Sequence, residues 1–153
     1  MGLDMYLSKK TYVKKWDHIP ADKQYEVAVT RGGQSYPNID PSRVNYVEEE
    51  MMYWRKANQI HGWFVKNIQN GEDNCREYYV SKEDLNALLE DCYAVHDDPI
   101  DAPLILPISD GFFFGNEEYD QHYFDQIKST IKVIETILQE WDEDADYYYQ
   151  SSW

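Results

Sequence analysis

The chain has 153 residues and a formal net charge of −15, from 29 acidic and 14 basic side chains. This length fits one domain with a sizeable core, and the acidic surplus argues against direct binding of nucleic acid, because phosphate contacts dominate that affinity. Residues 77–153 hold 19 of the acids and 3 of the bases. The field of this half would attract the basic surfaces of nucleic-acid-binding proteins.

Several sequence features predict where the protein resides. Cys75 and Cys92 lack the spacing of a zinc or redox motif, and no apolar run approaches the length of a membrane span. The N-terminus shows no signal peptide. We therefore expect a cytoplasmic protein with reduced thiols and no membrane contact.

Two strands and a long helix are predicted in the first half of the chain. Residues 3–7 and residues 24–30 alternate apolar and polar side chains, which is the period of a half-buried strand. From Val44 to Ile68 apolar residues recur at helical spacing along one stripe. We therefore expect a central helix over this stretch.

The predicted central helix has two faces with different chemistry. Asn58 and His61 interrupt its apolar stripe, and such groups can orient a ligand or transfer protons, although core packing is the alternative for both. Trp63 falls on the opposite face among lysines, with Arg55 at its edge. Arg and Trp are favoured at protein hot spots and at anion sites. These four residues are the candidate binding residues of this helix.

The second half is predicted to alternate strands and helices, because a capping motif and helical spacing follow apolar runs. The predicted elements are a strand over 77–80, a helix from Ser81 through Cys92, a strand over 104–106, a loop over 111–115 that docks its phenylalanines on the core, and a helix over 119–141.

These elements predict an α+β fold. We expect one compact domain over residues 1–141, with two long helices and one short helix packed on a small, mainly antiparallel sheet. Residues 142–153 are expected to form an acidic and aromatic C-terminal tail.

Carboxylates gather in two parts of the acidic half and form a predicted binding surface. Carboxylates held on a rigid surface can imitate the phosphates of a duplex and occupy a basic cleft, whereas solvated faces kept for solubility are the alternative. The residues of this surface are Glu90, Asp91, Asp97, Asp98, Asp101, Asp142, Glu143, Asp144 and Asp146.

No metal, cofactor or catalytic set is predicted. Asp142, Asp144 and Asp146 match the first positions of a calcium loop, but the glycine and the bidentate glutamate of that loop are missing. No serine or cysteine is placed beside His61 as a nucleophile. We therefore expect a binding protein rather than an enzyme.

Four stretches carry a resemblance to a known family. They are the opening Met-Gly-Leu-Asp-Met-Tyr-Leu, the Tyr53–Val65 stretch, Asp73-Asn74-Cys75, and Gly111–Gly115 with Tyr119-Asp120. Together they resemble a family of small uncharacterised proteins from phages and prophages. The resemblance implies a phage setting, in which accessory proteins of this size inhibit or redirect host systems, including CRISPR and restriction defences.

Three functional hypotheses follow from the sequence. The leading one is a phage-encoded protein that binds a basic, nucleic-acid-handling host protein in the host cytoplasm, as a DNA mimic or steric blocker. The alternative is a ligand-binding protein or enzyme with a nucleotide pocket beside the central helix, formed by Arg55, Asn58 and His61. A third hypothesis is an assembly component that acts as a homo-oligomer.

Overall fold

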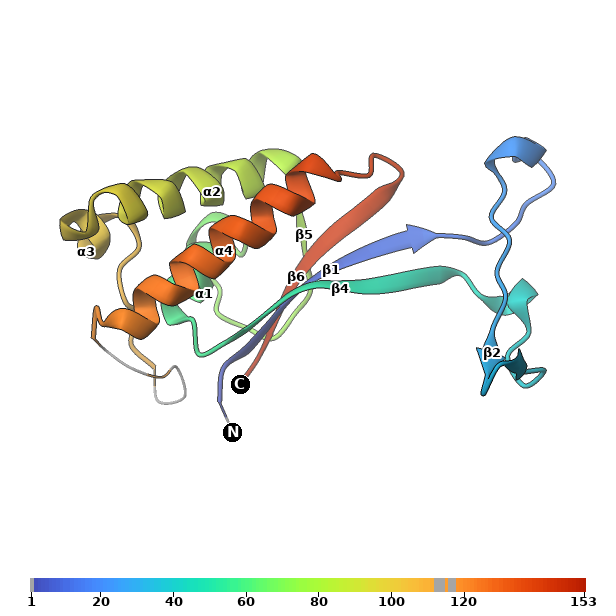
Figure 1. Cartoon of the computed structure of the whole chain (residues 1–153), viewed down its shortest axis with the longest axis horizontal. Coiled ribbons are helices and arrows are strands. Elements are labelled where there is room, and N and C mark those ends of the chain that lie inside the picture. The colour runs from blue at the N-terminus through green and yellow to red at the C-terminus, as the bar shows by residue number, and fades with distance from the viewer. Residues whose placement is uncertain (1, 112–114, 116–117) are drawn as a thin grey trace.

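The computed structural model describes residues 2–111, 115 and 118–153 and has an α+β fold built on one antiparallel sheet (Figure 1). The sheet has the strand order β4-β1-β6-β5, and each pair of neighbours is antiparallel. Its strands are β1 (Asp4–Tyr12), β4 (Tyr46–Arg55), β5 (Tyr78–Val80) and β6 (Ala145–Ser152). The helices are α1 (Asn58–Asn67), α2 (Lys82–Asp97), α3 (Ala102–Ile105) and α4 (Gln121–Gln139). The predicted fold class is confirmed.

Helices cover one face of the sheet, and the core lies between the two layers. In β6 the side chains of Ala145, Tyr147, Tyr149 and Ser151 are buried, and the alternate residues face away. The buried face meets α1 and α4 directly. Phe64 of α1 stacks on Tyr149 with ring centroids 3.8 Å apart.

The helices form where local signals place them. The predicted capping motif is confirmed, because Ser81 and Asp84 make the reciprocal hydrogen bonds of a capping box at the start of α2. The helix predicted over 119–141 is α4, which begins one residue after its N-cap, Asp120. Its Thr130 hydroxyl accepts a hydrogen bond from the Trp54 indole at 2.9 Å, which fixes α4 across the end of β4.

The long central helix predicted over residues 44–68 is wrong in its first half. Tyr46–Arg55 forms β4, and α1 starts at Asn58. Tyr, Val and Trp favour strands, and the glutamates of this stretch pair with lysines of β1. Lys9 lies opposite Glu49 in the register, with the ammonium and the carboxylate 3.7 Å apart. The residues of this stretch fit both the helical and the strand period, and pairing with β1 stabilises the strand.

The predicted tail over residues 142–153 is also wrong in its structure, because Ala145–Ser152 forms β6, inserted between β1 and β5. Two further predictions are corrected. The strand expected over 24–30 is mostly irregular and continues into the two-residue β2 (Thr30–Arg31), which pairs with β3 (Gln34–Ser35). Residues 104–106, which were expected to form a strand, instead form the end of the one-turn helix α3 and its C-cap. Most of the predicted loop 111–115 lies outside the described residues.

A projecting segment, residues 13–45, extends beyond the sheet between β1 and β4. We call it the arm. Figure 1 shows it as a bar set across the end of the β1–β4 ribbon, away from the helices. Besides β2 and β3 it contains two single-turn helices, at Ala21–Lys23 and Pro41–Arg43. No feature of the sequence predicted that this segment would leave the body of the protein.

The junction between β4 and α1 contains a strained residue. Lys56 has a φ of 55°, and its N–H donates to the Leu3 carbonyl at 2.7 Å. A left-handed conformation costs a residue with a Cβ about 1–2 kcal/mol. Glycine removes that cost but loses about 0.5–1 kcal/mol of entropy on folding. We therefore expect Lys56→Gly to raise the free energy of unfolding by about 0.5 kcal/mol in urea titrations.

The matched control is the neighbouring residue in extended conformation. Arg55→Gly should lower the free energy of unfolding, because Arg55 lies in β4 and glycine is unfavourable in strands. A Lys56→Gly protein that is less stable than the wild type would show that the lysine side chain contributes more than the backbone strain costs.

Candidate functional site

His61 lies at the centre of a hydrogen-bonded chain that runs from the buried Tyr149 to the exposed Asp73. It is 1% exposed, and its two ring nitrogens contact the Tyr149 hydroxyl at 2.7 Å and the Asp73 carboxylate at 3.0 Å. Burial raises the pKa of Tyr149 well above its usual value. The phenol therefore keeps its proton and donates to Nδ1, which leaves the Nε2–H to donate to Asp73. Trp153 adds an indole N–H to the same carboxylate oxygen at 3.3 Å.

The order carboxylate, imidazole, hydroxyl is that of a nucleophilic triad, but its location excludes that role. The Tyr149 hydroxyl belongs to a side chain with 0% exposure, stacked flat on Phe64, so no substrate atom can approach it. Burial also lowers the pKa of His61, although the nearby Asp73 acts to raise it. The chain therefore joins α1, the turn at Asp73 and β6 as a structural element.

Trp63 was predicted on the exposed face of the central helix, and this prediction is wrong. The side chain is 7% exposed, packs edge-on against Phe64, and donates its indole N–H to Asp91 at 2.8 Å. The helical spacing was correct, but α1 is short and covered on most of its circumference. Trp63 therefore links α1 to α2.

A small cleft lies beside α1, at the contact between Trp63 and the segment that follows α3. Its volume is about 160 Å³, which is below the roughly 300–1,000 Å³ of typical ligand pockets. Gly62 forms part of the wall, where a Cβ would lie 2.1 Å from the Ser109 hydroxyl oxygen. With a volume of about 160 Å³, the cleft is too small for a nucleotide.

The residues predicted for a nucleotide pocket do not converge on this cleft. Asn58 is 3% exposed, and its side-chain oxygen accepts the backbone N–H of Ser109 at 3.2 Å. His61 is bonded to Tyr149 and Asp73. Arg55 is exposed at the end of β4, and its backbone carbonyl accepts from Gln126. The structure thus separates Arg55 from Asn58 and His61 rather than joining the three in one site.

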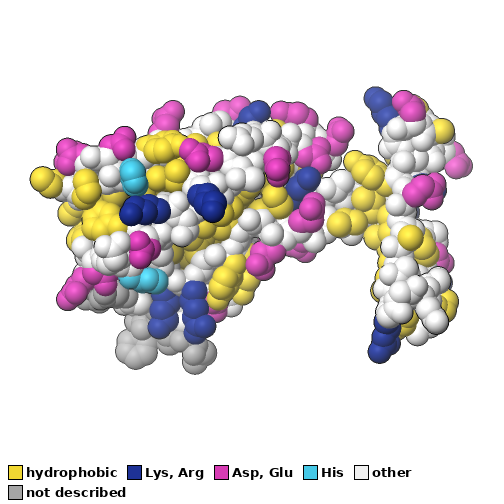
Figure 2. Space-filling model, viewed as in Figure 1, with side chains coloured by type: hydrophobic (Ala, Val, Ile, Leu, Met, Phe, Trp, Pro, Cys, Tyr) yellow, Lys and Arg dark blue, Asp and Glu magenta, His cyan; other side chains and the backbone are white. Residues whose placement is uncertain are grey.

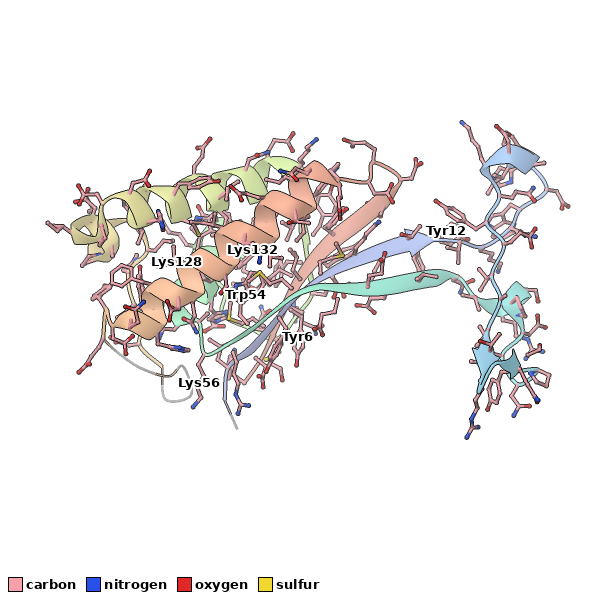
Figure 3. The ribbon with its side chains drawn as sticks, viewed as in Figure 1. Tyr6, Tyr12, Trp54, Lys56, Lys128 and Lys132 are labelled. Carbon is pink, nitrogen blue, oxygen red and sulfur yellow. The ribbon has the colours of Figure 1, made fainter. Side chains whose placement is uncertain are left out.

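The predicted acidic surface is split into two groups. Figure 1 places the C-terminal end of α2 and the following turn at one end of the body, and the turn before β6 at the other end, beside the arm. Between them Lys128 and Lys132 project from α4 (Figure 3). The nine carboxylates therefore do not form one continuous surface.

Three of these carboxylates bond other side chains among the described residues, and one of them is the exposed Asp97, which lies 3.2 Å from Nδ1 of His96. Asp91 accepts from Trp63. Asp142 lies 3.1 Å from the Lys9 ammonium, and its pKa is lowered first by the backbone N–H of Asp144 and then by Lys9. The exposed acids of α2 and its C-terminal turn form a line, which we call the α2 row (Figure 2). Its members are Glu83, Glu90, Asp97, Asp98 and Asp101.

The uncovered face of the sheet is rich in tyrosine. Tyr6 and Tyr53 lie 5.4 Å apart between ring centroids, and Tyr79 and Tyr148 lie 6.1 Å apart. The Lys10 ammonium sits 5.0 Å above the Tyr148 ring and also bonds Glu77. This face was missed by sequence reasoning, because half of its aromatic residues come from segments assigned to the central helix and the tail.

Comparisons with known proteins leave the functional assignment to geometry. No family model, curated protein or solved structure matches the chain. Within residues 2–111, 115 and 118–153 there is no group of three side chains that could hold a metal ion. Over the same described residues, no helix is long and apolar enough to cross a membrane.

Proposed function

We propose that this protein binds a basic, nucleic-acid-handling protein and blocks its nucleic-acid-binding cleft through the α2 row. The observation that carries the proposal is the fixed alignment of exposed carboxylates along a rigid helix. Glu83, Glu90 and Asp97 are seven residues apart, so they share one face of α2 at intervals of about 10 Å. Negative charge in such an array attracts a basic cleft and competes with the phosphates that the cleft normally binds.

The resemblance to phage proteins supports a host defence protein, such as a CRISPR or restriction protein, as the target.

The acids of the row are held by a helix whose inner side is packed. Leu85, Leu88, Cys92 and Val95 are buried against the core. The row therefore keeps its spacing without help from a partner, which reduces the entropic cost of binding.

The proposal predicts that charge position, rather than net charge, decides binding. The test variant is Glu90→Gln with Asp97→Asn and Asp101→Asn. The control variant removes the same charge elsewhere, as Glu48→Gln with Glu50→Gln and Glu72→Gln; all six side chains are exposed. We expect the test variant to lose at least tenfold in affinity for captured nucleic-acid-binding proteins, and the control to lose less than threefold.

In the capture experiment, host lysate is passed over the immobilised protein at low salt. Bound proteins are then eluted with duplex DNA or with roughly 500 mM salt, at which surface charges are largely screened. DNA should displace the captured proteins, because both occupy the same cleft. Captured proteins that resist DNA and salt, or that bind both variants equally, would refute the proposal. Binding curves are then measured on the proteins that DNA displaces.

A further inference from the structure

The arm, residues 13–45, is ordered without a core of its own. The structure describes every residue of this segment, and the one buried side chain is Val13, at 5% exposure. Its large apolar groups Trp16, Tyr25 and Ile39 are 41–45% exposed. Fixing a backbone costs roughly 1–2 kcal/mol per residue, and burial of one valine does not offset this over such a length. The arm therefore needs a covering surface that its own chain does not supply.

Local contacts hold the shape of the arm but bury little. Val13 donates its N–H to the Asn45 carbonyl at 2.9 Å, which closes the base of the arm. The Trp16 indole donates to the Tyr12 hydroxyl at 2.8 Å, and Tyr12 packs edge-on against Tyr46 (Figure 3). These contacts turn the aromatic side chains toward the base of the arm without covering them.

A hollow of about 520 Å³ separates the arm from the body. On the arm side it is lined by Asp22, Lys23, Gln24 and Tyr25, and on the body side by Tyr12 and Asp144. The hollow thus carries charges of both signs together with two tyrosines. A partner that fits it must offer the same mixture of charge and apolar surface.

We infer that the covering surface is the same patch on a second copy of this chain, so that two arms pack around a twofold axis. In such an interface each contact occurs twice, and a patch that holds both Lys23 and Asp144 is complementary to itself. The arm has five bases and four acids, so its net charge is +1 and the body carries −16. Contact through the arms therefore avoids the repulsion that two acidic bodies would meet in direct contact. This inference concerns a surface separate from the α2 row and does not depend on the proposed function.

The first test is the mass in solution, measured by size-exclusion chromatography with light scattering in a reducing buffer, since Cys75 is exposed. We expect the wild type to reach twice the 18.2 kDa of one chain as its concentration rises. A variant in which Asn-Gly replaces residues 14–44 closes the ribbon with a two-residue turn and should have the mass of one chain. A monomeric wild type, an armless dimer or a mass above two chains would each overturn the twofold arrangement.

The second test uses charge reversal and keeps the proposal falsifiable if the armless chain does not fold. Lys23→Glu and Asp144→Lys are each expected to raise the dissociation constant of the dimer at least tenfold. The double variant restores opposite charges across the interface and should return to within threefold of the wild type. A double variant that stays as weak as the single ones would refute the pairing of Lys23 with Asp144.

Discussion

A chain that ends at Asp142 is expected to have no cooperative fold. The deletion removes β6, which lies between β1 and β5 in the sheet, and with it two tyrosines of 0–1% exposure. Full burial of one large side chain contributes about 1.5–3 kcal/mol. The deletion also leaves β5 without a ladder partner, leaves β1 paired with β4 alone, and removes the Tyr149 hydroxyl from the His61 ring. Together these losses are comparable with the stability of a typical domain, which is about 5–15 kcal/mol.

The measurement is near-ultraviolet circular dichroism with urea unfolding. The truncated chain should show neither a tertiary signal nor an unfolding transition. The matched control removes Trp153 alone, which is 43% exposed and outside β6. This control should lose about 1 kcal/mol at most through its hydrogen bond to Asp73. A cooperative transition in the longer deletion would show that Ala145–Ser152 is dispensable.

The fold class could be predicted because several elements are specified by adjacent residues. The Ser81 capping box and the spacing of Tyr123, Ile127 and Ile134 depend on residues within the same helix. Strand β4 depends on contacts across the sheet. The consecutive lysines Lys9 and Lys10 face consecutive glutamates in antiparallel register, a pairing of opposite charges that the sequence contains and that would have favoured a strand over a helix.

The candidate site was less predictable, because its partners come from distant parts of the chain. Tyr149 lies 88 residues from His61, and Asp91 lies 28 residues from Trp63. Helical spacing correctly placed His61 on a buried stripe, but it could not show which hydroxyl would satisfy the ring. The acidic composition predicted exposed carboxylates, whereas the separation of the α2 row from the turn at Asp142 depends on how the helices lie on the sheet.

The buried imidazole of His61 should make stability depend on pH. Burial, its largest cause, lowers the pKa of native His61, whereas histidine in an unfolded chain titrates near 6.5. As the pH falls through about 6.5, the unfolded state binds a proton before the native state does, so the free energy of unfolding falls. The stability is therefore fully present above about pH 6.5 and is lost progressively below it, until the native pKa is reached.

Replacement of His61 tests both the pH dependence and the hydrogen bonds. His61→Leu cannot titrate, so its stability should change less between pH 7 and pH 5 than that of the wild type. At pH 7 it should be about 3 kcal/mol less stable, because the buried Tyr149 hydroxyl loses its bond to the ring and Asp73 loses the Nε2–H donor. Tyr149→Phe should cost about 1–3 kcal/mol by removing the hydrogen bond from the phenol to Nδ1. The double variant should cost less than the sum of the two, because one hydrogen bond is counted in both.

The control for titration is His96→Gln, since His96 is exposed on α2 and bonds its neighbour Asp97. This variant should keep the pH profile of the wild type. A profile that flattens in His96→Gln but not in His61→Leu would assign the pH dependence to the helix surface. Additive costs in the double variant would show that His61 and Tyr149 act independently. Coupling between them, with the profile lost in His61→Leu, would establish that this histidine holds the C-terminal strand to the core.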